Sequence, residues 1–465
     1  MTRWASPSRR RFLLRRLGLR RRGAPPRSPG GDPGSPRLQP GLPWRAPRFE
    51  PLLLALCALA ACSTIDSTSV EDVSRVCFAR SLARGHVDVD RCRGELVAFA
   101  RGRHVYSTKA PGMSALELPT VEAVRLPPDS RWAPDGDSKL WAVRALSSGL
   151  GFVLCAFLVG RIAEGIARGA GGFVLVAFAL GTLVAPLAVV SFDHVPTAAL
   201  GFAAFALAWR GRPAAAGLAG GGALLLDYQA ALVVVLVGAY ALLRGRRRAL
   251  VRYAAGAVPG VLLLAGYDSL AFGRPWRTPL AGGLRLPTAH GAWKVFLADR
   301  GLLVASPVVV AGALGLVLLW RSGHRAEAAL AGAVTAVLAL VECGFADPYG
   351  GVSPGPRYLA PALPFLALGL APMFAARRLV TAFVAGVSVV ATTAVTVSWA
   401  SGIHYVHTVW HQLTPYPGEV GAGRLDAYLQ RSVFSWVGVD PKQGALLAGL
   451  FAAAAFVVAL AGARE

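Results

Sequence analysis

The chain has 465 residues, of which 54% are hydrophobic and 16% are charged, and its mean hydropathy is +0.50. Soluble proteins carry about 25% charged residues, so this composition excludes a soluble globular enzyme and a disordered scaffold. It indicates a polytopic membrane protein. The net charge of +23 does not indicate nucleic-acid binding, because the basic residues are spread over an N-terminal arm and short loops between apolar runs.

Residues 1–50 differ in composition from the rest of the chain. They hold 13 Arg, 9 Pro and 2 acidic residues, and they show no apolar periodicity. This predicts a disordered cytoplasmic arm, which is either a solvated topology anchor or a segment that touches anionic lipid headgroups. The apolar run at 51–62 then fits a first membrane helix or, because it ends in Leu-Ala-Ala-Cys, a lipoprotein cleavage box.

The longest polar stretch is 63–139, which carries 11 of the 25 acidic residues and 11 basic ones. We expect a large extramembrane loop with helical pieces near 70–84 and 114–126. Cys77 and Cys92 lie in this loop, and in an oxidising compartment they can form a disulfide or remain two buried thiols.

Beyond residue 139, apolar runs alternate with short loops. Together with 51–62 they predict one all-α transmembrane domain, residues 51–465, with about twelve membrane helices. Asp227 interrupts the pair at 214–243, which could instead be one long helix. The predicted helices lie near 140–160, 172–192, 195–209, 214–226, 229–243, 253–272, 301–320, 328–342, 358–375, 379–399 and 445–462.

The charge of the loops predicts the orientation of the chain. Alternate loops, at 161–171, 210–213, 244–252, 321–327 and 376–378, hold 13 basic residues and 2 acidic ones. By the positive-inside rule these loops and the N-terminus are cytoplasmic. The loop 63–139 then faces outward from the plasma membrane. The Ala- and Arg-rich usage is typical of a bacterium with a GC-rich genome, so this would be an inner membrane.

Ionisable residues are scarce inside the predicted helices. Arg144, Asp268 and Glu342 are exceptions, and they lie near helix ends. Pumps and channels place ionisable groups within their spans, so the pattern favours an enzyme working at the outer interface. A transporter or lipid flippase is the main alternative, and a noncatalytic assembly protein is a third.

Two acidic pairs in the first outer loop are candidate site residues. Glu71 and Asp72 can supply a general base or bind a divalent cation such as Mg²⁺ or Mn²⁺, or they can compensate the dipole of a helix N-terminus. Asp88 and Asp90 form a D-x-D triplet that can hold a metal bridging a diphosphate. In the alternative interpretation, this triplet lies in a solvated loop.

Histidines mark two further places on the outer face. Asp193 and His194, in a tight turn between two predicted spans, can join a metal or acceptor site, or they can cap a helix. His404, His407 and His411 can share one helical face and bind a metal. Their aromatic neighbours fit an interfacial belt equally well.

Two segments carry groups suited to a phosphate. Lys109 stands before a Pro-Gly turn and can present its ammonium to an anion, close to Tyr106. Arg357 and Tyr358 follow a Gly- and Pro-rich segment and open directly onto a predicted helix, whose N-terminus also favours anions. Ordinary turns and interfacial anchoring are the alternative interpretations.

These segments, in this order, resemble the GT-C type of membrane glycosyltransferases. That class includes polyprenyl-phosphate-sugar-dependent enzymes related to protein mannosyltransferases and lipid A aminoarabinose transferases. The resemblance covers roughly 51–375, although the usual acidic pair reads Asp then Glu and here Glu71 precedes Asp72. The segments that carry it are 71–85, 106–112 followed by 116–119, 267–273, 300–307 and 350–359.

The resemblance implies inverting transfer of a sugar from a polyprenyl-phosphate donor to a cell-envelope acceptor on the outer face. Glu71 or Asp72 would be the general base. Lys109 and Arg357, with Tyr106 and Tyr358 beside them, would bind the donor phosphate. No cofactor is required by these residues, although a divalent cation could be held by the acids, with Asp193 and His194 joining them. Membrane lipid surrounds the helices, and nucleic acid is not an expected partner.

Overall fold

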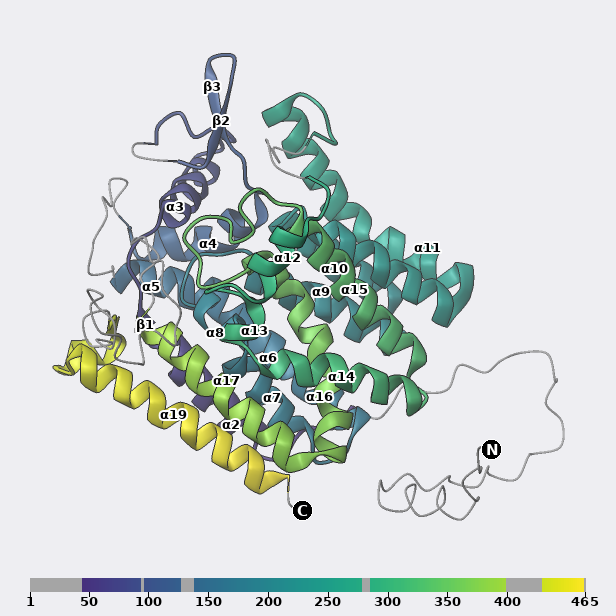
Figure 1. Ribbon diagram of the computed structural model, residues 1–465. Helices are drawn as coiled ribbons and strands as arrows, with labels where there is room; N and C mark the ends of the chain where they lie inside the picture. Colours follow the sequence, from purple (N-terminus) through teal and green to yellow (C-terminus); the bar gives the residue numbers. More distant parts are fainter. Residues whose placement is uncertain (1–43, 93–95, 127–137, 278–284, 399–428, 464–465) are drawn as a thin grey trace, which may run out of the picture.

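The computed structural model describes residues 44–92, 96–126, 138–277, 285–398 and 429–463 (Figure 1). This part of the chain is mostly helical. Six helical segments within it are long and apolar enough to cross a membrane. They are Ser138–Ile166 (α5, η1 and α6), Ala230–Phe272 (α11), Arg325–Cys343 (α15), Arg357–Ala376 (η2 and α16), Arg378–Ser398 (α17) and Pro441–Gly462 (α19).

Five shorter apolar helices accompany the long ones, and these are Glu50–Cys62 (α2), Gly171–Gly181 (α7), His194–Trp209 (α9), Pro213–Leu226 (α10) and Val308–Arg321 (α14). A polytopic, mostly helical membrane protein is therefore confirmed, but the predicted number of about twelve membrane helices is not. The all-α class also needs a small correction. Two short antiparallel strand pairs occur, β1 (Thr64–Ile65) with β4 (Arg431–Ser432), and β2 (Ala98–Arg101) with β3 (His104–Ser107).

Prolines break two of the predicted helices. The helix expected at 172–192 ends at Gly181, and α8 (Val184–Leu187) follows as a separate turn. A continuous helix would press the ring of Pro186 against the carbonyl of Thr182, where the backbone is extended. The helix expected at 301–320 is likewise divided at Pro307 into α13 (Leu302–Ala305) and α14.

Helices α10 and α11 pack with their backbones in close approach. Asp227 separates them, so the region 214–243 is not one helix. A Cβ added to Gly217 or Gly256 would overlap a carbonyl oxygen of the facing helix, as small residues at membrane-helix interfaces allow. The long run of α11 breaks at Arg246, where φ is 57°, and this divides it near the loop expected at 244–252.

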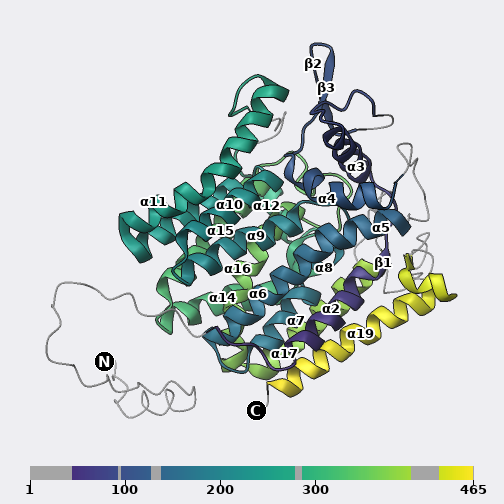
Figure 2. The same cartoon turned by 180° about the vertical axis from the view of Figure 1, so that it is seen from behind.

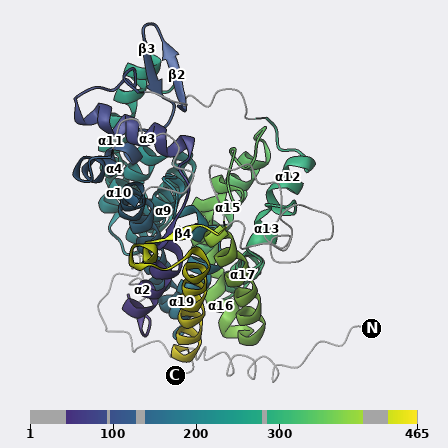
Figure 3. The same cartoon turned by 90° about the vertical axis from the view of Figure 1, so that its left-hand side faces the viewer.

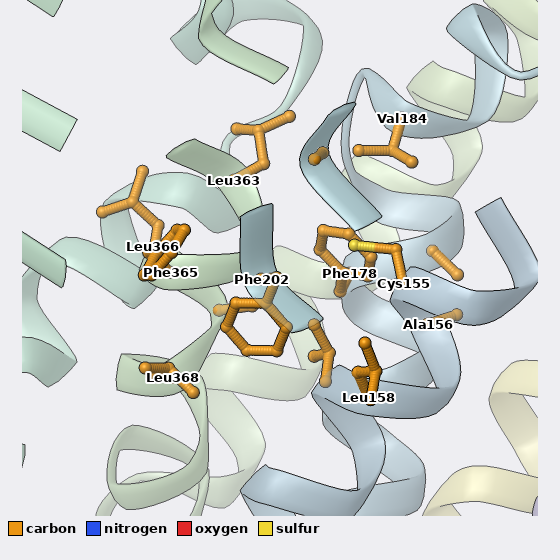
Figure 4. Close-up of a cluster of buried hydrophobic side chains, with 14 of the residues drawn as sticks. Cys155, Ala156, Leu158, Phe178, Val184, Phe202, Leu363, Phe365, Leu366 and Leu368 are labelled. Carbon is orange, nitrogen blue, oxygen red and sulfur yellow. The ribbon is translucent and has the colours of Figure 1, made fainter. Parts of the chain in front are cut away.

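The apolar core lies among α6 (Leu150–Ile166), α7, α9 and α16 (Leu363–Ala376). Figure 4 shows Phe178 of α7, Phe202 of α9 and Phe365 of α16 in this core. The rings of Phe202 and Phe365 meet edge to face with centroids 5.2 Å apart. Core packing therefore fixes the spans that end beneath the polar region described next.

A polar cap covers one end of the bundle. It consists of α3 (Val70–Ala83), the hairpin β2–β3 and α4 (Gly112–Ala123), which lie together at the top of Figures 1 and 2. Both helices were expected from the sequence, but the hairpin was not. Cys77 and Cys92 are joined by a disulfide, with their Cα atoms 6.0 Å apart.

Shorter elements complete the described fold. Figure 3 shows α12 on the opposite side of the molecule from α3 and α4. The remaining bounds are α5 (Ser138–Arg144), the π-helix η1 (Ala145–Gly149), α12 (Ala289–Phe296), and the 3-10 helices η2 (Arg357–Ala362) and η4 (Val433–Val437).

Candidate active site

Helix α3 begins with a capping box that fixes Asp72, and Glu71 stands beside it in the same turn. The side chain of Ser69 accepts a hydrogen bond from the backbone N–H of Asp72, and the carboxylate of Asp72 accepts one from the backbone N–H of Ser69. Such a box satisfies two orphan donors at a helix start. The box therefore holds Asp72 in place at the start of the helix.

Asp72 is buried and fully engaged. Its side chain is 1% exposed and pairs with Arg144, whose Nε lies 3.0 Å from Oδ1 and whose Nη2 lies 2.6 Å from Oδ2. Oδ2 also accepts from the hydroxyl of Ser69, and Oδ1 from the backbone N–H of Ser191. Arg144 holds the pKa of Asp72 below its usual range, although burial alone would raise it. This geometry leaves Asp72 a structural anchor between α3 and α5.

Glu71 has a different environment. Its Oε1 lies 2.9 Å from Nζ of Lys109 and 3.3 Å from Nη2 of Arg357, and its Oε2 lies 3.8 Å from Nη2 of Arg75. The side chain is 12% exposed, compared with 1% for that of Asp72. Lys109 comes from the turn before α4, and Arg357 opens η2. The structure thus brings together three of the predicted site residues from three distant parts of the sequence.

The cations around Glu71 decide its protonation. Burial by itself would raise the pKa of this carboxyl, but Lys109, Arg357 and Arg75 outweigh burial and lower the pKa to about 2. Ion pairs of this kind favour the charged form. Glu71 is therefore a carboxylate at neutral pH, and Lys109 and Arg357 are both held to one of its oxygens.

A second acidic group lies beside this cluster, at the start of α9. Oδ2 of Asp193 accepts from Arg75 at 2.7 Å. Its Oδ1 accepts no hydrogen bond within the described residues and lies 3.4 Å from Nδ1 of His194. Nδ1 of His194 also lies 3.3 Å from Oδ2 of Asp227. The ligand atoms of Asp193, His194 and Asp227 all lie within 4.8 Å of one another, a spacing that can hold a metal ion.

Aromatic rings line the contact between Arg357 and α9. The guanidinium carbon of Arg357 lies 4.5 Å from the ring centroid of Phe192 and 5.3 Å from that of Tyr358. The Tyr358 ring meets the His194 ring edge to face at 5.1 Å. Tyr358 therefore contacts both Arg357 of the Glu71 cluster and His194 of the Asp193 group.

Other predicted residues lie apart from the Glu71 cluster. Tyr106 pairs with Phe99 in the hairpin and packs against an apolar cluster that joins the cap to the end of α11. Asp88 and Asp90 form an outlying cluster with His104, in which Nδ1 of His104 lies 2.6 Å from Oδ2 of Asp90. His404, His407 and His411 lie outside the described residues.

Sequence reasoning missed two buried residues of the site. Arg75, four residues after Glu71, bridges Glu71 and Asp193. Glu117 in α4 is fully buried and accepts a 3.4 Å hydrogen bond from Ser147. Burial raises the pKa of Glu117 to about 8, despite the nearby Arg75. The i, i+4 spacing of Glu71 and Arg75 was a usable signal, whereas Glu117 lies in the 116–119 part of the family-like segments and was given no role there.

Comparisons with known proteins give distant structural likenesses. No family model matches the chain, and no curated protein matches it either. Among solved structures, the chain is similar to ArnT from Cupriavidus metallidurans bound to undecaprenyl phosphate, with 16% identity and a TM-score of 0.47, over 89% of this chain and 76% of that one. It is also similar to the apo oligosaccharyltransferase of Archaeoglobus fulgidus, with 13% identity and a TM-score of 0.43, over 82% of this chain and 60% of that one.

These distant likenesses agree with the resemblance that the sequence motifs indicate, and at TM-scores below 0.5 they carry no further argument. Likeness at this level of identity and TM-score does not define a substrate or a reaction. The function is therefore inferred below from the residues of the cluster itself.

Proposed function

We propose that this protein is an inverting, lipid-linked glycosyltransferase of the bacterial inner membrane. It would move a sugar from a polyprenyl-phosphate donor to an acceptor hydroxyl or amine on the extracytoplasmic face. One observation carries the proposal. A carboxylate with a 12% exposed side chain, Glu71, meets two cations, Lys109 and Arg357, where membrane-length helices end.

The chemistry follows from the contacts of these three residues. The acceptor oxygen or nitrogen attacks the anomeric carbon, and the bond from that carbon to the phosphate oxygen breaks. The electron pair leaves with polyprenyl phosphate, and the acceptor proton passes to Glu71. Lys109 and Arg357 stabilise the second negative charge that develops on the leaving phosphate.

Donor binding would also prepare the base. A carboxylate with a pKa near 2 accepts protons poorly at neutral pH, since a general base works best near the operating pH. A donor phosphate drawn to Lys109 and Arg357 competes with Glu71 for both cations. As they turn toward the phosphate, the pKa of Glu71 rises. Glu71 then becomes an effective base only when the donor is in place.

Asp72 is not the base in this proposal. Both of its oxygens are occupied by Arg144, Ser69 and Ser191, and its side chain is 1% exposed. Its role would be to hold the start of α3 so that Glu71 faces Lys109. Of the two carboxylates between which the sequence leaves the choice open, the proposal therefore takes Glu71 as the base.

A divalent cation is a further part of the proposal. Two carboxylates and an imidazole, from Asp193, Asp227 and His194, suit Mn²⁺ better than Mg²⁺, which prefers oxygen ligands. Oδ1 of Asp193, which accepts no hydrogen bond within the described residues, is consistent with a missing ligand bond. Such an ion would add positive charge beside the donor phosphate.

The proposal is tested by donor turnover in proteoliposomes. Wild type and Glu71→Gln receive a panel of polyprenyl-phosphate sugars with a cell-envelope acceptor fraction, and the release of polyprenyl phosphate is followed. Asp88→Asn serves as the matched control, since Asp88 is a carboxylate of the same cap outside the cluster.

Release by wild type and Asp88→Asn, with release by Glu71→Gln lower by about 10²–10⁴-fold, supports the proposal. Equal release by all three proteins moves the base away from Glu71. Movement of intact lipid across the bilayer, without release of polyprenyl phosphate, favours the flippase alternative.

A further inference from the structure

A basic hollow lies at the opposite end of the bundle from the Glu71 cluster. Its volume is about 760 Å³, and its charged lining consists of Arg45, Arg48, Arg168 and Glu164. The rest of the lining comes from the start of α7 and the C-terminal end of α19, which reaches the lower edge of Figure 1. The proposed reaction uses none of these residues.

The segment that supplies two of these arginines is fixed at both ends. At its start, the ring of Trp44 lies 4.7 Å from the guanidinium carbon of Arg210 and packs edge to face on Phe157. At its end, Glu50 forms a bidentate ion pair with Arg161, with 2.6 Å between Nε and Oε1. The segment 44–50, which we call the strap, is therefore packed onto the bundle. Residues 1–43 of the expected arm lie outside the described residues.

The strap also packs against two glycines of the hollow. A Cβ on Gly172 would meet the carbonyl oxygen of Arg48 at 3.7 Å, and one on Gly462 would meet Phe49 at 3.4 Å. Phe49 itself has φ of 58°, a backbone conformation that bulky residues rarely adopt. Arg48 lies over the ring of Phe49 at 5.2 Å. Packing thus holds the strap against the helix ends that form the hollow.

The charge of the hollow is positive overall. Glu164 is the acidic member of the lining, and both of its oxygens already accept backbone N–H groups, from Gly169 at 2.8 Å and Gly171 at 2.9 Å. Arg45 and Arg168 are exposed. Three arginines thus face one engaged carboxylate, so the chemistry favours an anion with several acceptor oxygens, such as a phosphate.

The position of the hollow indicates where that phosphate comes from. It lies where α2 and α7 begin and α19 ends. Two exposed apolar side chains, Phe49 at 45% and Leu52 at 47%, stand beside it. Basic pockets between membrane helices at a membrane surface bind phospholipid headgroups. We infer that this hollow binds the headgroup phosphate of an anionic phospholipid, on the membrane face opposite the Glu71 cluster. This inference does not depend on the proposed reaction.

Lipid binding by the detergent-solubilised full chain tests the inference. Native mass spectrometry measures the apparent dissociation constant of the first phosphatidylglycerol bound, with phosphatidylcholine as the net-neutral comparison and inorganic phosphate as competitor. The variant is Arg45→Gln with Arg168→Gln. The control is Arg321→Gln with Arg325→Gln, which removes the same charge from exposed positions outside the hollow.

The expected result is about thirtyfold weaker phosphatidylglycerol binding in the hollow variant, since each arginine near a membrane surface contributes about a factor of five. Wild type and control should bind alike and prefer phosphatidylglycerol to phosphatidylcholine. Equal binding by all three proteins, or equal binding of the two lipids, overturns the inference. Displacement of the lipid by millimolar inorganic phosphate would assign the hollow to free phosphate instead. If the double variant unfolds, Arg168→Gln alone should show about a fivefold loss.

Discussion

Replacing Glu71 by Gln separates donor binding from turnover. In the wild type, Lys109 and Arg357 are held to Oε1 of Glu71 at 2.9 and 3.3 Å. The amide that Glu71→Gln introduces lacks the charge that holds them, so both cations become available to a phosphate. We therefore expect the variant to bind polyprenyl phosphate more tightly than wild type, although its turnover falls by about 10²–10⁴-fold.

The structure gives a scale for the gain in binding. The pKa of Glu71 falls from 4.5 to about 2, which corresponds to roughly 3 kcal/mol of net interaction with its cations. If all of this interaction free energy contributed to donor binding in the variant, the affinity for polyprenyl phosphate would rise by about two orders of magnitude, which is an upper limit. Lys109→Met should change affinity in the opposite direction, because it removes a phosphate ligand.

The assay combines binding and pH profiles. Dissociation constants of polyprenyl phosphate are measured for wild type, Glu71→Gln and Lys109→Met. In wild type, the acid limb of kcat/KM reports the free enzyme and that of kcat the donor complex. Because the donor draws cations from Glu71, the limb of kcat should lie at higher pH than that of kcat/KM. Two results would refute the idea that Lys109 and Arg357 move from Glu71 to the phosphate. One is weaker donor binding by Glu71→Gln than by wild type, and the other is an acid limb of kcat at the same pH as that of kcat/KM.

Three further predictions concern the surroundings of Glu71. The pKa of Glu117 is about 8 in the folded protein and near 4.5 in the unfolded one, so its contribution to stability is present below pH 4.5 and is lost as pH rises through 8. Glu117→Gln should therefore become more thermally stable than wild type as pH rises from 5 to 8. A difference in Tm that does not change with pH would contradict this. Asp72→Asn breaks a buried pair with Arg144 and should lower unfolding stability by about 3–5 kcal/mol, as followed by thermal melting, and an unchanged melt would show that the pair is not an anchor. A chelator should reduce wild-type turnover, and His194→Ala should need at least about tenfold more Mn²⁺ than wild type to recover turnover. Turnover that is insensitive to chelator would show that the reaction uses no such cation.

The helices could largely be predicted from the sequence, because apolar runs of membrane length alternate with charged loops. The start of α3 could also be predicted from the sequence, since Ser69 and Asp72 stand at capping-box spacing. The predicted helix bounds were wrong where a single proline interrupts an apolar run. Pro186 ends a helix that hydropathy alone would continue to residue 192.

The division of roles within the acidic pair could not be predicted. Asp72 and Glu71 are adjacent, but their partners, Arg144 and Arg357, lie 72 and 286 residues away. Only tertiary packing decides which carboxylate is neutralised by one guanidinium and which meets the cations of two distant segments. Glu117 was missed for the same reason, since its burial depends on how α4 packs against the bundle.

The packing of the strap could not be predicted, because amino-acid composition averages over a whole segment and does not show the contacts of single residues. Arginine and proline dominate residues 1–50 and predict disorder. The structure shows that Trp44 and Glu50, a single aromatic and a single acid, have specific partners in Arg210 and Arg161. Two anchoring contacts are enough to hold a short basic segment against helix ends.

Photocrosslinking tests most directly whether the Glu71 cluster is the reaction centre. A polyprenyl phosphate with a diazirine next to its phosphate is bound to the full chain in proteoliposomes, irradiated, and mapped by peptide mass spectrometry. The account predicts label in the segments around Lys109 and Arg357, and loss of that label in Lys109→Met. Label confined to the hollow at Arg45 and Arg168, and unchanged by Lys109→Met, would contradict it.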